Sequence, residues 1–184
     1  MATPNVLNVI HAHARLIINP TDFTAAYPYG GTEIGIFRSI EWRPNVQTRE
    51  IAAEEWGGAN ANAVYAGERP LLLGVLRGYD ADAIAAHFPN TTTTLSQAQI
   101  TGHVATGSVP GTKLSTKAMS VLVAPKEETL DPALYLPNAL PVIQEDLAAK
   151  YSFASELGLA LSWVALPDAN GRLYDQGLLA NLVV

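Results

Sequence analysis

The stretch "YSFASELGLALSWVAL", residues 151–166, alternates large apolar side chains with small or polar ones more regularly than any other part of the chain. One side carries Tyr151, Phe153, Leu157, Leu159, Leu161 and Trp163. The other side carries Ser152, Ala154, Glu156, Gly158, Ala160 and Ser162. Because successive side chains of a strand point to opposite faces, this period of two predicts a long β-strand.

Four further stretches give the same type of signal. In "VIHAHARLII" (9–18) and "EIGIFRSIEW" (33–42) the even positions are apolar, with Arg38 interrupting the second run. These positions are Ile10, Ala12, Ala14, Leu16 and Ile18 in the first, and Ile34, Ile36, Ile40 and Trp42 in the second. "VYAGERPLLLGVLRGY" (64–79) predicts a buried strand entered through Gly67 and Pro70, and "KLSTKAMSVLVAP" (113–125) alternates more weakly.

Turn and helix signals complete the expected fold. Asn-Gly in "PDANGRLY" (167–174) predicts a tight hairpin joining the long strand to a closing strand near the C-terminus. Asp80 is a good helix N-cap, an apolar face runs from Ala81 to Phe88, and Pro89 ends the pattern. A second short helix is expected in "VIQEDLAAKY" (142–151). The sequence thus predicts a single mainly β domain over 1–184, an antiparallel β-sandwich or barrel with one flanking α-helix.

Three segments fall outside the expected core. Residues 44–63 form a long inter-strand loop with an acidic cluster at Glu50, Glu54 and Glu55. Residues 89–112 contain no charged side chain, and residues 125–141 are proline-rich and expected to be mostly loop. Loops this long are uncommon in a compact domain unless they have a use, which suggests contacts with partners.

Composition points to a protein covered by its partners. Hydrophobic residues make up 48% of the 184 residues and charged residues only 15%, less than is usual for a soluble protein. The net charge of −6 argues against binding nucleic acid by phosphate neutralisation. The chain has no cysteine, and we find no secretory signal and no apolar run long enough for a membrane helix. We therefore expect a soluble protein, made in the cytoplasm, with no membrane contact.

The glycine-rich stretch "YPYGGTEIG" (27–35) superficially resembles a phosphate-binding loop. A Walker loop needs Lys followed by Ser or Thr, but Ile36 and Phe37 follow the last glycine. A dinucleotide loop needs a helix after its glycines, and here an alternating strand pattern follows. Gly30 and Gly31 are therefore interpreted as a turn.

The remaining candidates for chemistry are weak. His11 and His13 share one face of an expected strand, but a metal site needs further ligands, and His87 and His103 have no suitable spacing. "GSVPG" (107–111) lacks the order of a nucleophile elbow, and the adjacent glutamates are typical of solvated charge clusters. We expect no catalytic, cofactor-binding or metal-binding residues, and no enzyme.

Two tryptophans are expected in the core and one on the surface. Trp42 and Trp163 lie on apolar strand faces, whereas Trp56 lies in the acidic loop beside two glycines. An exposed Trp56 near Asn60 and Asn62 would also suit a carbohydrate-binding β-sandwich, which remains an alternative.

The order of several motifs resembles the tail tube (major tail) proteins of long-tailed bacteriophages, which are similar in architecture to the type VI secretion tube. The motifs are "NPTDFTAAYPYGGTEIGIFRSIEWRP", "REIAAEEWGG", the turn at Gly67, "LLLGVLRGYDADAIAAHFPN" and the "ALPDANGRLY" hairpin. Together they cover most of the chain, although each is a soft pattern.

The resemblance implies a virion structural protein. Subunits would form six-membered rings that stack into a hollow tube around a tape-measure protein, with tail terminator and baseplate proteins as further partners. DNA would pass through the lumen without specific binding. By position, the resemblance assigns contacts between rings to Arg49, Glu50, Glu54, Glu55 and Trp56, and a second contact arm to residues 2–10. A tail terminator or a capsid decoration protein is the alternative within the same class.

Overall fold

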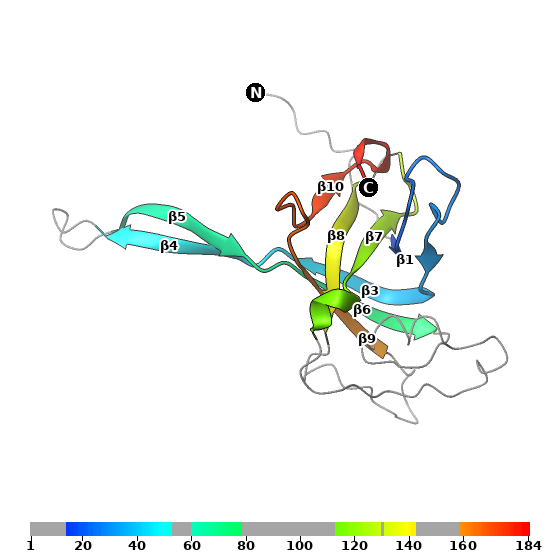
Figure 1. Ribbon diagram of the computed structural model, residues 1–184, viewed down its shortest axis with the longest axis horizontal. Coiled ribbons are helices and arrows are strands. Elements are labelled where there is room, and N and C mark those ends of the chain that lie inside the picture. Colours follow the sequence, from blue (N-terminus) through cyan, green and yellow to red (C-terminus); the bar gives the residue numbers. More distant parts are fainter. Residues whose placement is uncertain (1–13, 53–59, 79–112, 130, 143–158) are drawn as a thin grey trace.

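The computed structural model describes residues 14–52, 60–78, 113–129, 131–142 and 159–184 (Figure 1). The described residues form ten strands and two short 3-10 helices, so the fold is mainly β, and all pairing is antiparallel. The elements are β1 (Ala14–Ile18), β2 (Thr32–Glu33), β3 (Ile36–Arg43), β4 (Val46–Ala52), β5 (Asn60–Glu68), β6 (Leu71–Gly78), η3 (Leu114–Lys117), β7 (Met119–Pro125), β8 (Ala133–Pro141), β9 (Leu159–Ala165), β10 (Asp175–Gly177) and η4 (Leu179–Asn181).

The two predicted helices cannot be compared with this description. The helix expected over 80–88 lies outside the described residues, as does all but the first residue of the one expected over 142–151. Within the described ranges, no helix is long and apolar enough to cross a membrane.

The body of the protein is one antiparallel sheet in the order β2-β1-β7-β8-β9-β6-β3. Strand β8 changes partner along its length, since β10 pairs with Ala133–Tyr135 and β9 pairs with Ala139–Pro141. In Figure 1, β3, β6 and β9 run across the direction of β7 and β8, so the sheet is bent around the core. Strands β1 and β3 stand near opposite ends of this strand order. A hydrogen bond links the two regions, since the backbone N–H of Ile34, just before β3, donates to the carbonyl of Leu16 in β1 at 3.1 Å.

The expectation that residues 125–141 are mostly loop is wrong, because β8 is a central strand of the sheet. Pro137 lies where the partner of β8 changes from β10 to β9 and where its register with β7 shifts between Leu136 and Ala139. Proline cannot donate to a ladder and is tolerated where pairing is interrupted. Pro141 is the last residue of the strand. Both prolines therefore fit a strand that the sequence pattern hides.

The core lies on the inner side of the bend and confirms the predicted strand signals where they can be tested. Leu161 and Trp163 of β9 are fully buried, as are Leu16 of β1 and Leu72 of β6. Trp42 is half-buried, with its ring edge against Tyr174 at 4.9 Å between centroids. A second buried cluster on the other side of the sheet includes Ile17, Phe23, Tyr29, Leu122, Ala124, Ala133, Tyr135 and Leu179. Burial of both faces explains why the alternation in β1 and β7 is incomplete.

In β3 the predicted apolar face is only partly correct. Ile40 and Trp42 pack against the core, but Ile36 is 70% exposed. The register with β6 shifts on both sides of Phe37, which turns that ring inward in place of Ile36. The ring lies over Gly74, where an added Cβ would be 2.6 Å from it.

The turn predicted at 167–174 is present, but the predicted hairpin is not. Gly171 has a φ of 79°, and the Asp168 carboxylate accepts from the backbone N–H groups of Asn170 and Arg172. Arg172 in turn pairs with Asp168 at 3.1 Å and Asp175 at 2.8 Å. The strand that follows, β10, pairs with β8 and not with β9. Strands β9 and β10 follow one another along the same edge of β8, and the turn lies between them.

Candidate assembly surfaces

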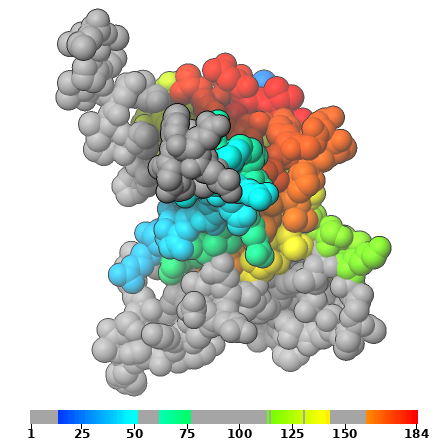
Figure 2. Space-filling view, turned by 90° about the vertical axis from the view of Figure 1, so that its left-hand side faces the viewer, coloured from blue at the N-terminus to red at the C-terminus, as the bar shows by residue number. Residues whose placement is uncertain are grey.

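The two-stranded sheet of β4 and β5 projects from the body, and we call it the arm (Figure 1). It continues the β3–β6 pair: Pro44 and Asn45 join β3 to β4, while Arg69 and Pro70 join β5 to β6. Figure 2 looks along the arm from its far end, with the arm in front of the body. The long loop expected over 44–63 is therefore wrong in type, because this segment belongs to a β-hairpin.

The same hairpin corrects the strand expected over 64–79. That stretch is divided at Arg69 and Pro70 into the end of β5 and the whole of β6. Only the second part enters the body, since Leu72 and Leu76 are fully buried whereas Val64 and Tyr65 are about half exposed, at 47% and 60%.

The pairing register defines two faces of the arm. Arg49 lies opposite Val64 and Ile51 opposite Asn62, while Thr48 lies opposite Tyr65 and Glu50 opposite Ala63. Directly opposed residues of an antiparallel pair share a face, as do positions two apart in one strand. The Arg49 face therefore consists of Arg49, Ile51, Asn62 and Val64, and the Tyr65 face of Thr48, Glu50, Ala63 and Tyr65.

Both faces of the arm present apolar side chains to solvent. Ile51 and Val64 on the Arg49 face are 46% and 47% exposed, and Tyr65 on the other face is 60% exposed. An isolated two-stranded hairpin is at best marginally stable in water, because it has no third strand or helix to bury its side chains. The described residues of the body do not cover these apolar side chains of the arm.

The arm meets the body at a narrow junction. Asn45 has a φ of 47°, and its side-chain amide donates to the carbonyl of Arg69 at 3.2 Å. The backbone N–H of Arg69 donates back to the carbonyl of Asn45 at 3.4 Å. Next to the junction, a register shift between Gln47 and Thr48 is accommodated beside Gly67, which has a φ of 128°. These local contacts orient the arm with little apolar packing.

The five residues predicted to make contacts between rings are only partly described. Arg49 and Glu50 lie next to each other in β4, so they occupy opposite faces of the arm, and both are exposed. Glu54, Glu55 and Trp56 lie outside the described residues, as do residues 2–10. Sequence reasoning missed Ile51, Val64 and Tyr65, which supply the arm's exposed apolar surface.

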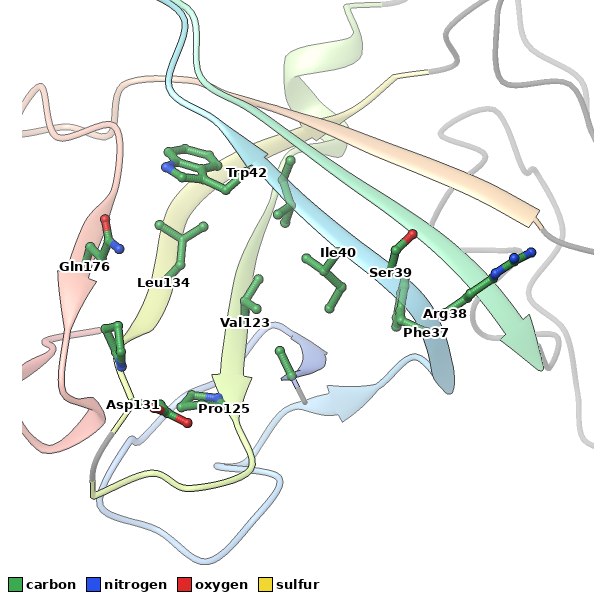
Figure 3. A pocket seen from close by; sticks show the side chains of 13 residues that line it. Phe37, Arg38, Ser39, Ile40, Trp42, Val123, Pro125, Asp131, Leu134 and Gln176 are labelled. Atoms are coloured by element: carbon green, nitrogen blue, oxygen red, sulfur yellow. The ribbon is translucent and has the colours of Figure 1, made fainter. Parts of the chain in front are cut away.

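Beside β3 the body has a pocket of about 400 Å³ (Figure 3). It is lined by Ala14, Phe37, Arg38, Ser39, Ile40, Trp42, Leu72, Val123, Pro125, Asp131, Pro132, Leu134 and Gln176. Figure 3 shows Ile40, Val123 and Leu134 around its middle, with Arg38 and Asp131 toward opposite sides. The wall is thus mainly apolar, with charged groups at the two sides.

Asp131 is the unusual member of this lining. Its residue surface is only 6% exposed, and its carboxylate makes no hydrogen bond or ion pair with any residue that the structure describes. Its oxygens are not among the fully buried side-chain atoms that lack a hydrogen-bond partner, so the carboxylate reaches the space of the pocket.

The glycine-rich stretch at 27–35 is a turn, as predicted. Gly30 has a φ of 71°, and a Cβ on Gly31 would be 2.6 Å from the carbonyl oxygen of Ile18, so the backbone is packed against protein. The Tyr29 hydroxyl donates to the Glu128 carboxylate, and burial, followed by that contact, raises the pKa of Tyr29. Strands β2 and β3 follow the turn, where either nucleotide-binding loop would require a helix.

The same turn also contacts β1 through the side chains of Arg15 and Tyr27. The Arg15 guanidinium lies 4.5 Å from the centre of the Tyr27 ring. Burial, with Glu33 adding to it, raises the pKa of Tyr27 to about 12, so this phenol is neutral over the physiological range. The ring contact and the hydrogen bonds hold the turn closed against the sheet.

The structure does not describe the histidines considered as metal ligands, because all four lie outside the described residues. The described part of the chain contains no group of three or more His, Cys, Asp or Glu side chains that could hold a metal ion.

Comparison with known proteins gives no family: neither a protein-family model nor a curated protein sequence matches the chain. The arm and the pocket beside β3 are therefore the candidate functional surfaces of the described residues.

Proposed function

We propose that this chain is a virion structural protein that assembles with copies of itself into stacked rings, forming the hollow tail tube of a long-tailed bacteriophage. The observation that carries the proposal is the arm, a projecting strand pair with exposed apolar residues on both faces. Such a surface is expected to be buried against another protein.

The two kinds of surface suit repeated assembly. The arm projects at one side, and the pocket and the outer edge of β3 lie on the body. A contact between two different surfaces of identical subunits is heterologous, so it propagates as a ring or an open stack instead of ending at a dimer. The low charge content of 15% supports a subunit whose surface is extensively covered.

The remaining details of the proposal come from the resemblance in sequence. They are the six-membered ring and the tape-measure, terminator and baseplate partners. The sandwich or barrel with a helix over 80–88 is the fold that the residue pattern predicts. In this role the protein lies in the virion tail after assembly in the host cytoplasm, and DNA passes through the lumen without specific binding. The protein acts without catalysis.

The test compares the full chain with a variant that lacks the arm. The variant replaces residues 46–68 by Asn-Gly, which leaves the last β3–β6 pair, Arg43 with Leu71, in place. We expect the full chain to form stacked rings or tubes in negative-stain electron microscopy at high concentration. We expect the shortened chain to melt cooperatively with β-type circular dichroism and to remain monomeric in light scattering.

A milder variant separates the arm's shape from its apolar surface. Changing Ile51 and Val64 to Thr keeps β-branched residues in the strands and removes apolar contact. Val183→Thr is a matched control, because Val183 is also exposed, at 66%. Long tubes from the shortened chain would refute the role of the arm, and single rings that never stack would identify a terminator in place of a tube.

A further inference from the structure

We propose that the Arg49 face of one copy's arm docks in the pocket beside β3 of a neighbouring copy, where the Arg49 guanidinium pairs with the Asp131 carboxylate. This inference rests on the proposed function only in requiring contact between copies of the chain. It goes further by identifying the surface that receives the arm and the charged pair that aligns it.

The donor side is a cation between apolar residues. Arg49 is exposed and makes no ion pair with a described residue, while Val64 lies directly opposite it and Ile51 lies two positions along the same strand. Val64 and Ile51 are each about half exposed, at 47% and 46%. An arginine with aliphatic neighbours can enter an apolar pocket, because its methylene stem packs there and its planar guanidinium pairs with a carboxylate.

The acceptor side is complementary in both respects. The pocket wall around Ile40, Val123 and Leu134 is apolar. Asp131 is 6% exposed as a residue, and its carboxylate has no partner among the described residues. An arriving guanidinium would supply the counter-charge and the hydrogen bonds that this carboxylate lacks. The pocket volume of about 400 Å³ is large enough for several side chains of one arm face.

The Tyr65 face fits the pocket less well. It carries Glu50, whose charge would be brought toward Asp131, and like charges in a buried contact are strongly unfavourable. The Arg49 face has no acidic residue. At the Asp131 side of the pocket, charge therefore favours the Arg49 face, while Arg38 lies toward the opposite side (Figure 3).

The docking arm has to come from another copy. The pocket is lined by β3 up to Trp42, and the arm continues beyond the end of that strand. Seven residues of extended chain place Arg49 roughly 23 Å past Trp42. Figure 1 shows the arm extending away from the body, so its own pocket lies behind it. A contact of arm to pocket between successive copies is heterologous, as stacking requires.

Cross-linking tests the placement, because the chain has no cysteine of its own. Asn62→Cys puts a thiol on the Arg49 face, and Gln176→Cys puts one on an exposed residue of the pocket lining. The matched control pairs Gln176→Cys with Ala63→Cys, which is the next residue but lies on the Tyr65 face. In assembled protein treated with a short bis-maleimide, we expect a ladder of linked chains from the first pair, at least about fivefold stronger than from the control.

Each outcome of that experiment decides between the two proposals. Tubes or rings that form without the ladder, or with equal ladders from both pairs, would overturn the docking and leave the proposed function standing. Links only within single chains would show that the arm folds onto its own pocket and would also overturn it. Protein that stays monomeric at every concentration and gives no ladder would count against both.

A charge exchange tests the pair itself. Arg49→Glu should raise the concentration needed for assembly at least about tenfold, and the double variant Arg49→Glu with Asp131→Lys should reverse most of that loss. Lys117→Glu, the same charge change at an exposed site of η3, is the control. The pairing is refuted if Arg49→Glu behaves like Lys117→Glu.

Neutral variants keep the test decisive if Lys at the buried position 131 unfolds the chain. Arg49→Gln and Asp131→Asn then form a double-variant cycle, each checked for an unchanged melting transition. If the two residues pair, the effect of Arg49→Gln on assembly is much smaller when Asp131 is already Asn. Independent, multiplying effects would refute the pairing.

Discussion

The strand pairs β6–β9 in the body and β4–β5 in the arm are both antiparallel, but they differ in residues and in surroundings. Leu72 and Trp163 of the body pair are fully buried, whereas Val64 and Tyr65 of the arm are 47% and 60% exposed. Among the described strands, β6 has a neighbour on each edge, β3 and β9, but β5 is paired only with β4. Strands β6 and β9 consist mainly of apolar residues, whereas β4 and β5 mix apolar residues with charged and amide ones, so composition and covering differ together.

This difference separates what stabilises one chain from what is available for association. Burial of apolar surface contributes about 25 cal/mol per Å², and in the body that gain is realised when the single chain folds. The exposed side chains of the arm gain little in the monomer. Their apolar surface stays exposed, and in the proposed assembly another copy of the chain would cover it. Evidence that the arm stabilises the monomer, or that the body does not depend on its core, would contradict this contrast.

The largest effect is expected from truncating the core. Trp163→Ala should lower the free energy of unfolding by about 3–5 kcal/mol, because it removes a fully buried ring and leaves a cavity. Tyr65→Ala on the arm should change it by less than about 0.5 kcal/mol in the monomer. Urea unfolding at a concentration too low for assembly measures both. Equal losses would show that the arm is part of the monomer's core.

A smaller effect is expected from substituting two glycines, Gly74 and Gly67, whose positions require glycine for different reasons. Gly74→Val should destabilise the body by about 1–3 kcal/mol, because an added Cβ would lie 2.6 Å from the Phe37 ring. Gly67→Ala meets nothing within 4 Å, but its φ of 128° strains a side chain.

The two glycine variants should affect different parts of the molecule, Gly74→Val the body and Gly67→Ala the arm. Thermal unfolding should register Gly74→Val, while hydrogen exchange should show Gly67→Ala mainly as faster exchange in β4 and β5. A global loss of stability from Gly67→Ala equal to that from Gly74→Val would contradict the separation of arm and body.

The same contrast explains which strands could be predicted from the sequence. The apolar alternation in β9 and the apolar run in β6 follow directly from burial, so their pattern is visible in the residues. Strand β8 was missed because Pro137 and Pro141 suggest a loop when the change of pairing partner at Pro137 is not known. Its apolar residues carry the signal, but only the sheet topology explains the prolines.

The arm and the pocket show the limits of a sequence pattern more clearly. Ile51 and Tyr65 lie on opposite faces of the arm, so its strands show no apolar face and were expected to be a loop. Arg49 and Glu50 were placed in the contact region by resemblance. Asp131 gave no signal, since nothing in its neighbouring residues indicates that it lines a pocket. The juxtaposition of Asp131 with Val123 and Leu134 exists only in the folded sheet.

The junction gives a local effect of moderate size. Asn45→Ala removes the hydrogen bond to the Arg69 carbonyl and places Ala at a φ of 47°, which together should weaken the junction by about 1–2 kcal/mol. Amide exchange in β4 and β5 should accelerate by roughly tenfold, with β6 and β9 unchanged. The same substitution at Asn19, which also has a positive φ but lies in the body, is the control. Unchanged exchange in the arm of Asn45→Ala would show that other contacts fix the arm.

The smallest effect is expected from a charge cluster of the body. The backbone N–H of Arg172 is the largest influence that lowers the pKa of Asp168 below its ordinary value near 3.8, and the hydrogen bond and charge of the Arg172 side chain act in the same direction. Because the folded pKa is the lower one, this stabilisation is complete above pH 3.8 and is lost as the pH falls through the folded pKa.

Melting curves across the acid range measure this contribution. Asp168→Asn should melt at a lower temperature than the parent chain at neutral pH, and the difference should shrink as the pH falls below about 4. A difference that stays constant into acid would mean that Asp168 stabilises the turn through hydrogen bonds that do not need its charge. Assembly at neutral pH should survive the change, because neither Asp168 nor Arg172 lines the pocket or belongs to the arm. A loss of assembly would show that the turn at 168–172 is itself a contact surface.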